Sequence, residues 1–269
     1  DYEISCRREK EMEELVDKYG WDGSYYLYGY SDNGSPFGSS QCEEGKIHLI
    51  PQLWAVIANI GSVEQRASAL SEVEKQLDSE LGTIALAPSY THYDEQIGEM
   101  TAKPVGLFLN GGVYMHIMCW KLAVDCMIKD RELAQRDLNR LLPFRNKVVA
   151  NRAEPYVMCN SYFGIDSGYR YGTAGQSWRT AANGWLLKAL INFIFGLKPE
   201  MKGIRVEPCI PCEWKTAEIT KRFREAVYRI QYENGGNEVK SIKVDGIPIE
   251  SNILPYEAGG EYDVKVIMG

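Results

Sequence analysis

Apolar positions recur at helical spacing over the first part of the chain. Residues 7–19 follow one such pattern and end at Gly20, a residue typical of helix C-termini. Residues 50–60, with Pro51 in the first turn, are apolar on more than one face, whereas residues 62–79 have a single apolar stripe. A helix that is buried on several sides, followed by one that is buried on one side, predicts a packed helical hairpin.

The same pair of patterns returns later in the chain. Residues 111–129 are largely apolar, residues 130–142 are amphipathic, and a third apolar stretch runs from Thr180 to about residue 195. Alternating apolar and one-sided helices, joined by long polar and aromatic loops, are typical of an α/α toroid with inner and outer helices. We expect the loops at one end of this toroid to form the site, and the aromatic segment 21–30 to border its cleft.

The periodicity changes after Pro199. Hydrophobic and polar residues now alternate, and Gly-containing turns separate the alternating runs. The runs are residues 204–208, 217–222, 226–232, 238–244 and 262–267. This pattern predicts a small antiparallel β domain. The sequence therefore predicts two domains, a helical one over residues 1–199 and a β domain over residues 200–269.

Composition and charge narrow the class of protein. The chain has 269 residues, of which 45% are hydrophobic, so it can bury a substantial core. The 30 Lys and Arg residues against 37 Asp and Glu residues give a formal net charge of −7, which argues against nucleic acid and membrane surfaces as partners. The longest apolar run, residues 184–196, is interrupted by Lys188 and Asn192 and is too short to span a bilayer. We expect a soluble protein.

Cysteine and histidine usage predicts no metal site. The seven cysteines are an odd number, and the pair Cys209 and Cys212 lacks the second ligand pair that a zinc knuckle needs. The three histidines, His48, His92 and His116, are scattered. The first ten residues are charged and do not resemble a signal peptide. We expect reduced thiols, a cytoplasmic location and no metal.

Two helices contain candidate anion donors. A polar and aromatic loop, residues 154–180, ends at a helix start, where the free N–H groups of Ala181 and Ala182 form the positive end of the helix dipole. Such a terminus can hold a phosphate, and Thr180 can equally be a plain N-cap. His116 lies on an otherwise apolar helix, either as a satisfied core histidine or, with an anion beside it, as a donor.

Acid–base chemistry would need carboxylates that face one another. Two loop carboxylates in one cleft could serve a glycosidase. The candidates in predicted loops are Asp22, Glu43, Glu44, Asp94, Glu95 and Glu154. Sequence spacing does not tell which of them face each other. The sequence has no phosphate-cradling loop of the nucleotide-binding type, no nucleophilic-serine elbow and no zinc-protease motif.

Several motifs together resemble one enzyme family, the inverting glycoside phosphorylases of the cellobiose and chitobiose phosphorylase type. In chain order the matching segments are Trp21-Asp22-Gly23, Glu43-Glu44-Gly45-Lys46-Ile47, Pro51-Gln52-Leu53-Trp54-Ala55, Asn110-Gly111-Gly112-Val113-Tyr114-Met115-His116, Glu154-Pro155-Tyr156-Val157, Gly175-Gln176-Ser177-Trp178-Arg179-Thr180, Gly196-Leu197-Lys198-Pro199 and Val206-Glu207-Pro208-Cys209-Ile210-Pro211. The resemblance covers essentially the whole chain. Agreement of many motifs in order and spacing is far more specific than any one of them.

The resemblance implies an (α/α)6 barrel followed by an antiparallel β-sandwich. It further implies that residues 1–199 are the C-terminal half of the barrel and residues 200–269 the sandwich. Family members are much longer, and their general acid is the aspartate of an Asp-Trp-Asn-Asp type segment that this sequence lacks. We therefore expect the catalytic acid upstream of this chain, and the chain alone to be catalytically incomplete.

The implied reaction is phosphorolysis of a β-glycosidic bond with inversion. The upstream acid protonates the glycosidic oxygen while inorganic phosphate attacks the anomeric carbon from the opposite face, giving a sugar 1-phosphate. The resemblance makes His116, Thr180 and the N–H of Ala181 the phosphate donors, with Arg179 adding charge nearby. The implied substrate-binding residues are Asn110, Tyr156 and Gln176. The implied partners are a β-linked disaccharide or oligosaccharide and inorganic phosphate, and we expect the full-length protein to be a homodimer.

Three positions depart from the family pattern, and two alternative functions stay open. Phe108 and Leu109 stand where cellobiose phosphorylases have a Lys-Glu pair that bears on sugar recognition, and Ala181 stands where the family has glycine. An inverting hydrolase on the same barrel, in which Glu43 or Glu44 activates water, is one alternative. A non-catalytic carbohydrate-binding fragment, in which loop aromatics stack on sugar rings, is the other.

Overall fold

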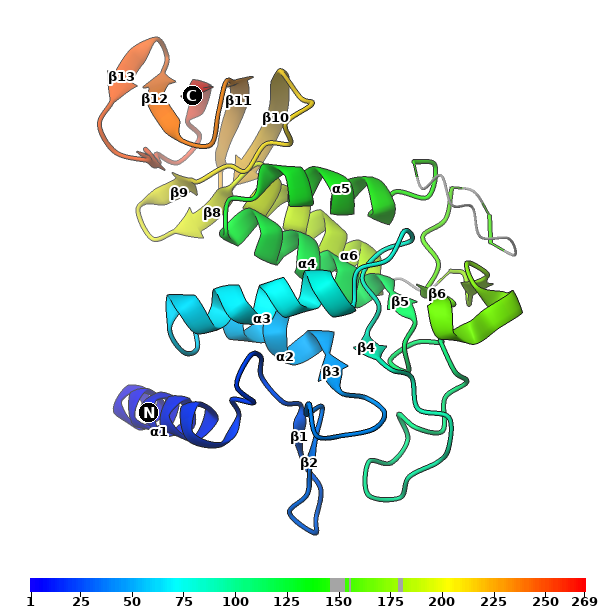
Figure 1. Cartoon of the computed structure of the whole chain (residues 1–269). Coiled ribbons are helices and arrows are strands. Elements are labelled where there is room, and N and C mark those ends of the chain that lie inside the picture. The colour runs from blue at the N-terminus through cyan, green and yellow to red at the C-terminus, as the bar shows by residue number, and fades with distance from the viewer. Residues whose placement is uncertain (146–152, 155, 179–180) are drawn as a thin grey trace. The chain divides into compact units, whose positions relative to one another are not determined.

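The computed structural model describes residues 1–145, 153–154, 156–178 and 181–269. Within them the chain divides into two compact units, unit 1 (Asp1–Lys121 and Arg140–Ala182) and unit 2 (Leu122–Asn139 and Asn183–Gly269). The border between the units passes through α4 (Met115–Met127), α5 (Arg131–Leu141) and α6 (Ala181–Ala189), which Figure 1 labels. The division of the chain at residue 199 stays a prediction.

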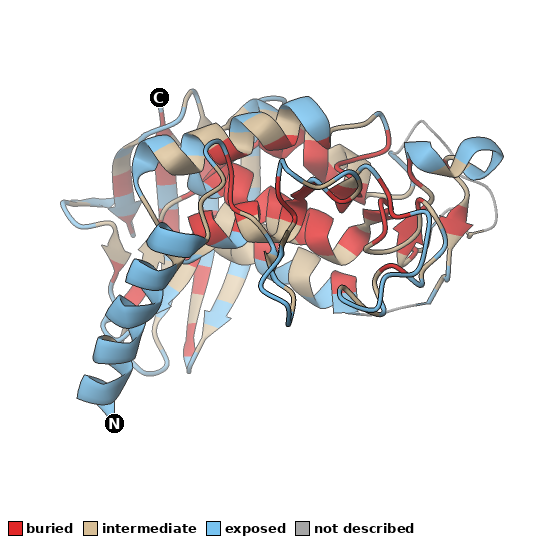
Figure 2. Ribbon diagram, turned by 60° about the horizontal axis from the view of Figure 1, so that its bottom comes forward, coloured by how far each residue is buried: buried red, intermediate tan, exposed pale blue. Residues whose placement is uncertain are grey.

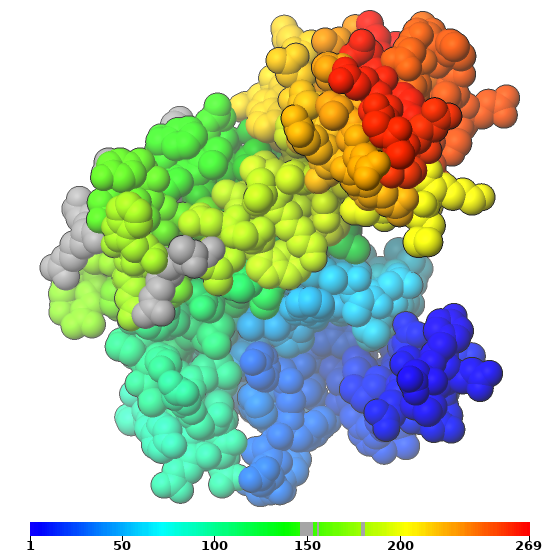
Figure 3. All heavy atoms as spheres, turned by 180° about the vertical axis from the view of Figure 1, so that it is seen from behind, coloured from blue at the N-terminus to red at the C-terminus, as the bar shows by residue number. Residues whose placement is uncertain are grey.

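Helix α1 (Tyr2–Tyr19) contains the predicted helix of residues 7–19 and extends it toward the N-terminus. It ends at Gly20 as predicted, where the Gly20 N–H donates a hydrogen bond to the Val16 carbonyl at 2.7 Å. No residue of this helix is buried. Figure 2 shows its surface as exposed, and in Figure 3 its atoms form a lobe of their own in deep blue.

The predicted helical hairpin is present in unit 1 as α2 (Leu49–Ile57) and α3 (Val63–Gln76), which pack against each other. Helix α3 starts with a reciprocal cap. The Gln65 N–H donates to Ser62 Oγ at 3.1 Å, and the Ser62 N–H donates to Gln65 Oε1 at 2.7 Å. Each helix buries one apolar side, and Leu53 of α2 and Val73 of α3 are fully buried there.

Helix α4 is the apolar helix predicted over residues 111–129. It begins later than predicted because Val113 and Tyr114 form strand β5 (Val113–Tyr114). Its Lys121 side chain is only 1% exposed and forms an ion pair with Glu74 of α3 at 2.9 Å. A buried charge is costly without a partner, so this ion pair constrains how α4 packs on α3.

Short strands connect the loops of unit 1. They form three small antiparallel sheets. The first pairs β1 (Gly29–Tyr30) with β2 (Pro36–Phe37), the second pairs β3 (Ile47–His48) with β4 (Leu86–Ala87), and the third has the order β5, β6 (Ser161–Tyr162), β7 (Ala174–Gly175). A 3-10 segment, Ile165–Arg170, lies between β6 and β7 in the chain.

Unit 2 contains two sheets that follow the last helix. Helix α6 continues into a π-helical turn, Leu190–Ile194. One sheet has three strands in the order β14 (Ile253–Leu254), β9 (Gly203–Val206), β8 (Leu197–Glu200). The other has five strands in the order β10 (Thr216–Phe223), β11 (Ala226–Asn234), β15 (Glu261–Met268), β12 (Val239–Val244), β13 (Ile247–Ile249). All five alternating runs of the sequence are strands in the structure.

The prediction of a purely antiparallel β domain is wrong at one strand pair. Strands β11 and β15 run parallel, with Val227 opposite Glu261 and Asn234 opposite Met268. The physical reason is the connection: after β13 the chain contributes β14 to the three-stranded sheet and then returns to the larger sheet between β11 and β12. Alternation of hydrophobic and polar residues is the same in both strand directions, so it could not predict this crossover.

No helix in the described part of the chain is long and apolar enough to cross a membrane. This agrees with the interruption of residues 184–196 by Lys188 and Asn192.

His48 lies buried among aromatic rings in unit 1. Its ring centroid is 4.6 Å from that of Tyr28, and its Nε2 lies 3.4 Å from the hydroxyl of Tyr90. Burial lowers the pKa of His48 from 6.5 to about 4. The unfolded chain therefore takes up a proton at His48 at a higher pH than the folded chain does.

We expect this histidine to make the fold acid-sensitive. Because the pKa of His48 is lower in the folded state, the stabilising effect of its neutral side chain is complete above pH 6.5 and is lost as the pH falls toward 4. The free energy of unfolding should fall by about 3 kcal/mol over this range. Urea unfolding between pH 7.5 and 4.5 measures this loss. The His48→Gln variant should show a flatter pH dependence, whereas the exposed control His92→Gln should keep the parent's slope. Equal slopes in parent and His48→Gln would contradict the assignment.

Candidate functional site

A pocket of about 450 Å³ in unit 1 contains one of the predicted site residues. Its lining combines two amides, an aromatic and aliphatic wall and one ion pair. The lining residues are Glu99, Met100, Lys103, Phe108, Leu109, Tyr114, Asn160 and Gln176. Gln176 was predicted to bind substrate, and Tyr114 immediately precedes α4, the helix of His116. This pocket is therefore the first candidate for a sugar site.

The small sheet of β5, β6 and β7 brings three of these side chains together. The Met115 N–H donates to the Asn160 carbonyl at 3.0 Å, and the Asn160 N–H donates to the Gln176 carbonyl at 2.8 Å. Tyr114, Asn160 and Gln176 therefore come from neighbouring strand ends. The sequence analysis missed Tyr114 and Asn160. The nearness of Tyr114 to the double glycine was a usable signal, but no local pattern predicts the pairing that brings Asn160 to it.

Asn110 is fully buried and holds together the long connection between β4 and β5. Its Oδ1 accepts a hydrogen bond from the Tyr90 N–H at 2.7 Å. Its Nδ2 donates to the Tyr90 carbonyl and to the Lys103 carbonyl, each at 2.9 Å. The amide thus binds main chain on both of its polar atoms, and Asn110 is not among the residues that line the pocket. The predicted contact of Asn110 with substrate stays a prediction.

The two glycines after Asn110 are required by close packing. Gly111 has a φ of +79°, and a Cβ there would lie 2.0 Å from Ser89 Oγ. A Cβ on Gly112 would lie 2.6 Å from the main-chain nitrogen of Phe108. Any larger residue would therefore displace the loop that bears Phe108, which is part of the pocket wall.

His116 is the second residue of α4 and is half-buried. Its ring is part of a row of aromatic side chains in unit 1. Ring centroids lie 6.3 Å apart for Phe108 and Tyr114, 6.4 Å for Tyr114 and His116, 4.8 Å for His116 and Trp120, and 5.4 Å for Trp120 and Trp54. Burial lowers the pKa of His116, which favours the neutral imidazole at neutral pH. A neutral imidazole has one N–H to donate.

The first residues of α6 lie against α4. The Cys119 thiol, one helical turn after His116, donates to the Ala182 carbonyl at 3.3 Å. Ala181, the first residue of α6, is exposed. Thr180 and Arg179 lie outside the described residues, so the predicted meeting of His116 and Thr180 at one phosphate stays a prediction.

Tyr156 and Glu154 lie away from the pocket lining. The Tyr156 side chain is 74% exposed and does not line the pocket, so its predicted contact with substrate also stays a prediction. Glu154 Oε1 accepts a hydrogen bond from Trp178 Nε1 at 2.8 Å. This hydrogen bond lowers the pKa of Glu154, which favours a carboxylate and disfavours a role as proton donor.

A second, polar cleft of about 720 Å³ brings several of the candidate carboxylates together. Glu43, Glu44, Asp94 and Glu95 all line it. Glu44 accepts hydrogen bonds from the Thr91 hydroxyl at 2.6 Å and from the Thr91 N–H at 3.1 Å. Asp94 accepts from the Gln96 N–H at 2.8 Å. These two carboxylates therefore fix the loops on which they lie.

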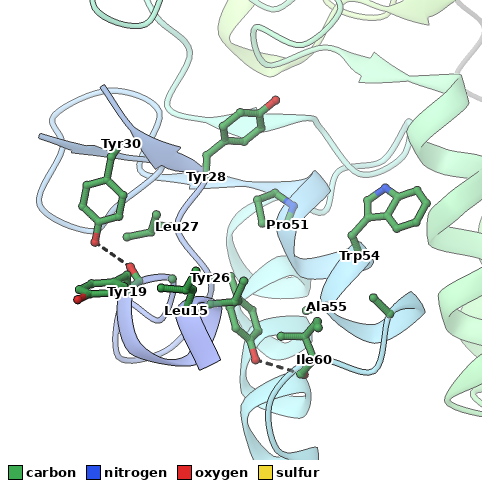
Figure 4. A pocket seen from close by; sticks show the side chains of 13 residues that line it. Leu15, Tyr19, Tyr26, Leu27, Tyr28, Tyr30, Pro51, Trp54, Ala55 and Ile60 are labelled. Carbon is green, nitrogen blue, oxygen red and sulfur yellow. Dashed lines mark hydrogen bonds between the residues drawn. The ribbon is translucent and has the colours of Figure 1, made fainter. Parts of the chain in front are cut away.

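A third hollow is an apolar groove of about 420 Å³ between α1, the segment before β1 and α2 (Figure 4). Tyr26, Tyr28 and Tyr30 of the aromatic segment 21–30 line it, whereas none of residues 21–30 lines the pocket that contains Gln176. Tyr30 donates to the Tyr19 carbonyl at 2.7 Å, and Tyr26 donates to the Ile60 carbonyl. None of the lining residues is a carboxylate or a histidine, so this groove offers no general acid or base of the kind that glycoside chemistry uses.

Among the described residues, no group of three or more His, Cys, Asp or Glu side chains is arranged to hold a metal ion. The cysteines are all free, and Cys209 and Cys212 do not share an environment, since the first is buried and the second exposed.

Comparison with known proteins gives one family. Residues 2–196 match the model of the glycosyl hydrolase 94 superfamily, catalytic domain. Similar curated proteins include a 3-O-beta-D-glucopyranosyl-beta-D-glucuronide phosphorylase of Paenibacillus borealis, 31% identical over 96% of this chain and 34% of the relative. Others are a solabiose phosphorylase of Paenibacillus borealis, 32% identical over 93% and 33%, and an N,N'-diacetylchitobiose phosphorylase of Vibrio proteolyticus, 32% identical over 96% and 33%. The chain spans about a third of the length of these relatives.

We expect loss of the Asn110 amide to destabilise unit 1 strongly. The Asn110→Ala substitution leaves the Tyr90 N–H and two carbonyls buried without their partner, which should lower the free energy of unfolding by about 3 kcal/mol. Urea unfolding followed by circular dichroism measures this change. Asn33→Ala is a matched control, because Asn33 makes its hydrogen bonds within an exposed turn, and it should cost under about 1 kcal/mol. Similar costs for both variants would contradict a bracing role for Asn110.

Proposed function

This chain belongs to the glycosyl hydrolase 94 superfamily, and we propose that it is the C-terminal portion of a glycoside phosphorylase. The proposed reaction cleaves a β-glycosidic bond with inorganic phosphate and with inversion, and gives a sugar 1-phosphate. The observation that carries the proposal is the family match over residues 2–196, which includes the starts of both α4 and α6. The names of three similar proteins, all phosphorylases that match this chain over nearly its whole length, support it.

In this proposal the helices are the C-terminal half of an (α/α)6 barrel and the strands after Pro199 belong to a β-sandwich. The relatives are about three times as long as the chain, so they have room for the rest of the barrel and for the general acid. None of the carboxylates of this chain is assigned as that acid. Glu154 is poorly suited to that role, because Trp178 stabilises its charged form.

The phosphate site would lie where α4 and α6 start. The contact of Cys119 with the Ala182 carbonyl supports this placement, because it brings the first turns of the two helices together. His116 would donate its imidazole N–H, the Ala181 N–H would donate from the positive end of the α6 dipole, and Thr180 would add its hydroxyl. Donors that are fixed before phosphate arrives hold it in line with the anomeric carbon.

The pocket beside Tyr114 would bind a sugar. Aromatic and aliphatic walls with a few amide groups are typical of sugar-sized sites, and Phe108, Leu109, Asn160 and Gln176 supply these groups here. The relatives are named for three different disaccharides, so their names do not identify the substrate of this chain. The apolar side chains of Phe108 and Leu109 favour a sugar that presents an apolar face or substituent to them.

We place the proposed enzyme in the cytoplasm, and the homodimer stays a prediction. All seven cysteines are free thiols, which supports a reducing compartment. The reaction requires no metal or organic cofactor in this proposal, because phosphate is the nucleophile and the protein supplies donors.

The phosphate site can be tested by titrating this chain with inorganic phosphate in a calorimeter. His116→Ala should weaken phosphate binding roughly tenfold, because it removes one donor to a charged acceptor worth about 1.5–3 kcal/mol. His92→Ala, a substitution in the polar cleft, should bind phosphate like the parent. Ala181→Gly, which restores the residue of the family, should preserve or tighten binding. If His116→Ala binds phosphate as tightly as the parent, His116 is a core residue only.

The reaction class can be tested with the enzyme that includes the residues preceding this chain. We expect it to cleave a β-glucoside only in the presence of phosphate and to release a sugar 1-phosphate of inverted configuration, seen by nuclear magnetic resonance. The 269-residue chain alone should show no turnover. Release of free sugar without phosphate would favour a hydrolase, and sugar binding without turnover by the longer enzyme would favour a binding protein.

A further inference from the structure

The five-stranded sheet of unit 2 has two edges that differ in kind. One edge is β13, which has three residues and contains Pro248. The other edge is β10, which has eight residues and no proline, and Figure 1 labels both strands. Short strands and prolines protect a sheet edge against pairing with another chain. In the described part of the chain β10 pairs only with β11, so its outer side is open to a further strand.

The contacts of the neighbouring residues show which main-chain groups of β10 face this open side. The Asn234 N–H donates to the Lys215 carbonyl at 2.9 Å, so the odd-numbered residues that follow Lys215 face β11. Val227 lies opposite Arg222 and donates its N–H away from β10, to the Gly260 carbonyl at 2.9 Å. The N–H and C=O groups of the even-numbered residues therefore point outward. These residues, all exposed, are Thr216, Glu218, Thr220 and Arg222.

Charged side chains of β11 and β15 are paired across the strands, whereas those on the same face of β10 are not. The cross-strand ion pairs are Arg229 with Glu261 at 2.8 Å and Lys265 with Glu233 at 2.6 Å. Among the residues that the structure describes, Glu218 and Arg222 of β10 form no ion pair. The sheet thus places opposite charges side by side wherever a strand has neighbours on both sides, and leaves two opposite charges unpaired on its open edge strand.

We propose that β10 is the interface of a homodimer, in which this strand pairs antiparallel with β10 of a second copy of the chain. A twofold axis through Thr220 places Glu218 of each copy opposite Arg222 of the other. The even-numbered residues then exchange about six main-chain hydrogen bonds, two for each hydrogen-bonded pair. Because the same patch is used by both copies, each contact between Glu218 and Arg222 occurs twice.

Charge selects this register over its neighbours. Shifting the axis by one residue in either direction puts Thr220 opposite Glu218 or opposite Arg222, so these two charged residues no longer meet. On the other face of the sheet, the proposed register puts Lys221 opposite Ile219 of the second copy, where the methylene stem of the lysine covers the apolar side chain. This dimer does not depend on the proposed reaction.

Sedimentation velocity of the 269-residue chain over a wide range of concentration tests the dimer. We expect a reversible dimer, because pairing at one sheet edge buries a small area. Arg222→Glu puts two glutamates opposite each other in both symmetric contacts and should raise the dissociation constant of the dimer about tenfold or more. Glu218→Arg should have the same effect. The double variant Glu218→Arg/Arg222→Glu restores opposite charges and should restore the dissociation constant of the parent.

Two further variants separate the interface from general effects of charge and folding. Lys243→Glu reverses a charge at an exposed position of β12, in the same sheet, and should leave the dissociation constant unchanged. Thr220→Pro removes an N–H that faces away from β11, so it should abolish the dimer and keep the pairing of β10 with β11. Circular dichroism and the melting temperature of each variant show that the fold is kept.

Three results would overturn the proposal. The first is a parent chain that stays monomeric at its highest soluble concentration. The second is a dimer whose dissociation constant both single charge reversals leave unchanged, because such a dimer uses another surface. The third is a double variant that associates no better than the single variants, because the two charges then do not face each other.

Discussion

The buried amide of Asn110 is the constraint on which the candidate site of unit 1 depends. One side chain satisfies the Tyr90 N–H, the Tyr90 carbonyl and the Lys103 carbonyl, so the start and the middle of the long connection between β4 and β5 are held at a fixed spacing from its end. The chain then turns at Gly111 and Gly112 and continues directly into β5 and α4. An apolar residue at position 110 would leave three main-chain groups unsatisfied in the interior, which a loop cannot compensate.

Close main-chain contact around this turn determines where the side chains of Phe108, Tyr114 and His116 lie. The Gly112 carbonyl accepts a hydrogen bond from the Ala85 N–H at 2.8 Å, and a Cβ on Gly164 would lie 1.9 Å from the Gly111 carbonyl. Three loops thus meet with no room for side chains between them. Phe108 and Tyr114, on either side of the turn, are placed as one wall, and His116 follows with its ring half-buried at the start of α4. Partial burial of the imidazole favours its neutral form. The neutral imidazole can donate a hydrogen bond and needs no counterion.

The helices could be predicted from the sequence because periodicity reports which face is buried, and the structure has helices in all six predicted segments. Predictions failed where the outcome depends on contacts between distant segments. Val113 and Tyr114 look like the start of an apolar helix, yet they pair with Ser161 and Tyr162 as a strand. The resemblance implies that Asn110 binds substrate, which stays a prediction, and no local signal shows that its amide binds the main chain of Tyr90 and Lys103. The parallel pair of β11 and β15 was unpredictable for the same reason.

The hydrogen bonds of the loop carboxylates favour a phosphorylase over a hydrolase for the chemistry that this chain would support. A hydrolase needs a carboxylate that is free to take a proton from water. Asp22 accepts hydrogen bonds from Ser39 Oγ and the Ser40 N–H, and Glu44 accepts two from Thr91. These two carboxylates are engaged in holding their loops, and the hydrogen bond from Trp178 lowers the pKa of Glu154. Phosphate needs no base, since it arrives as an anion and is itself the nucleophile. It needs donors that are already in place, and in the proposed site these are the His116 imidazole on α4 and the Ala181 N–H at the start of α6.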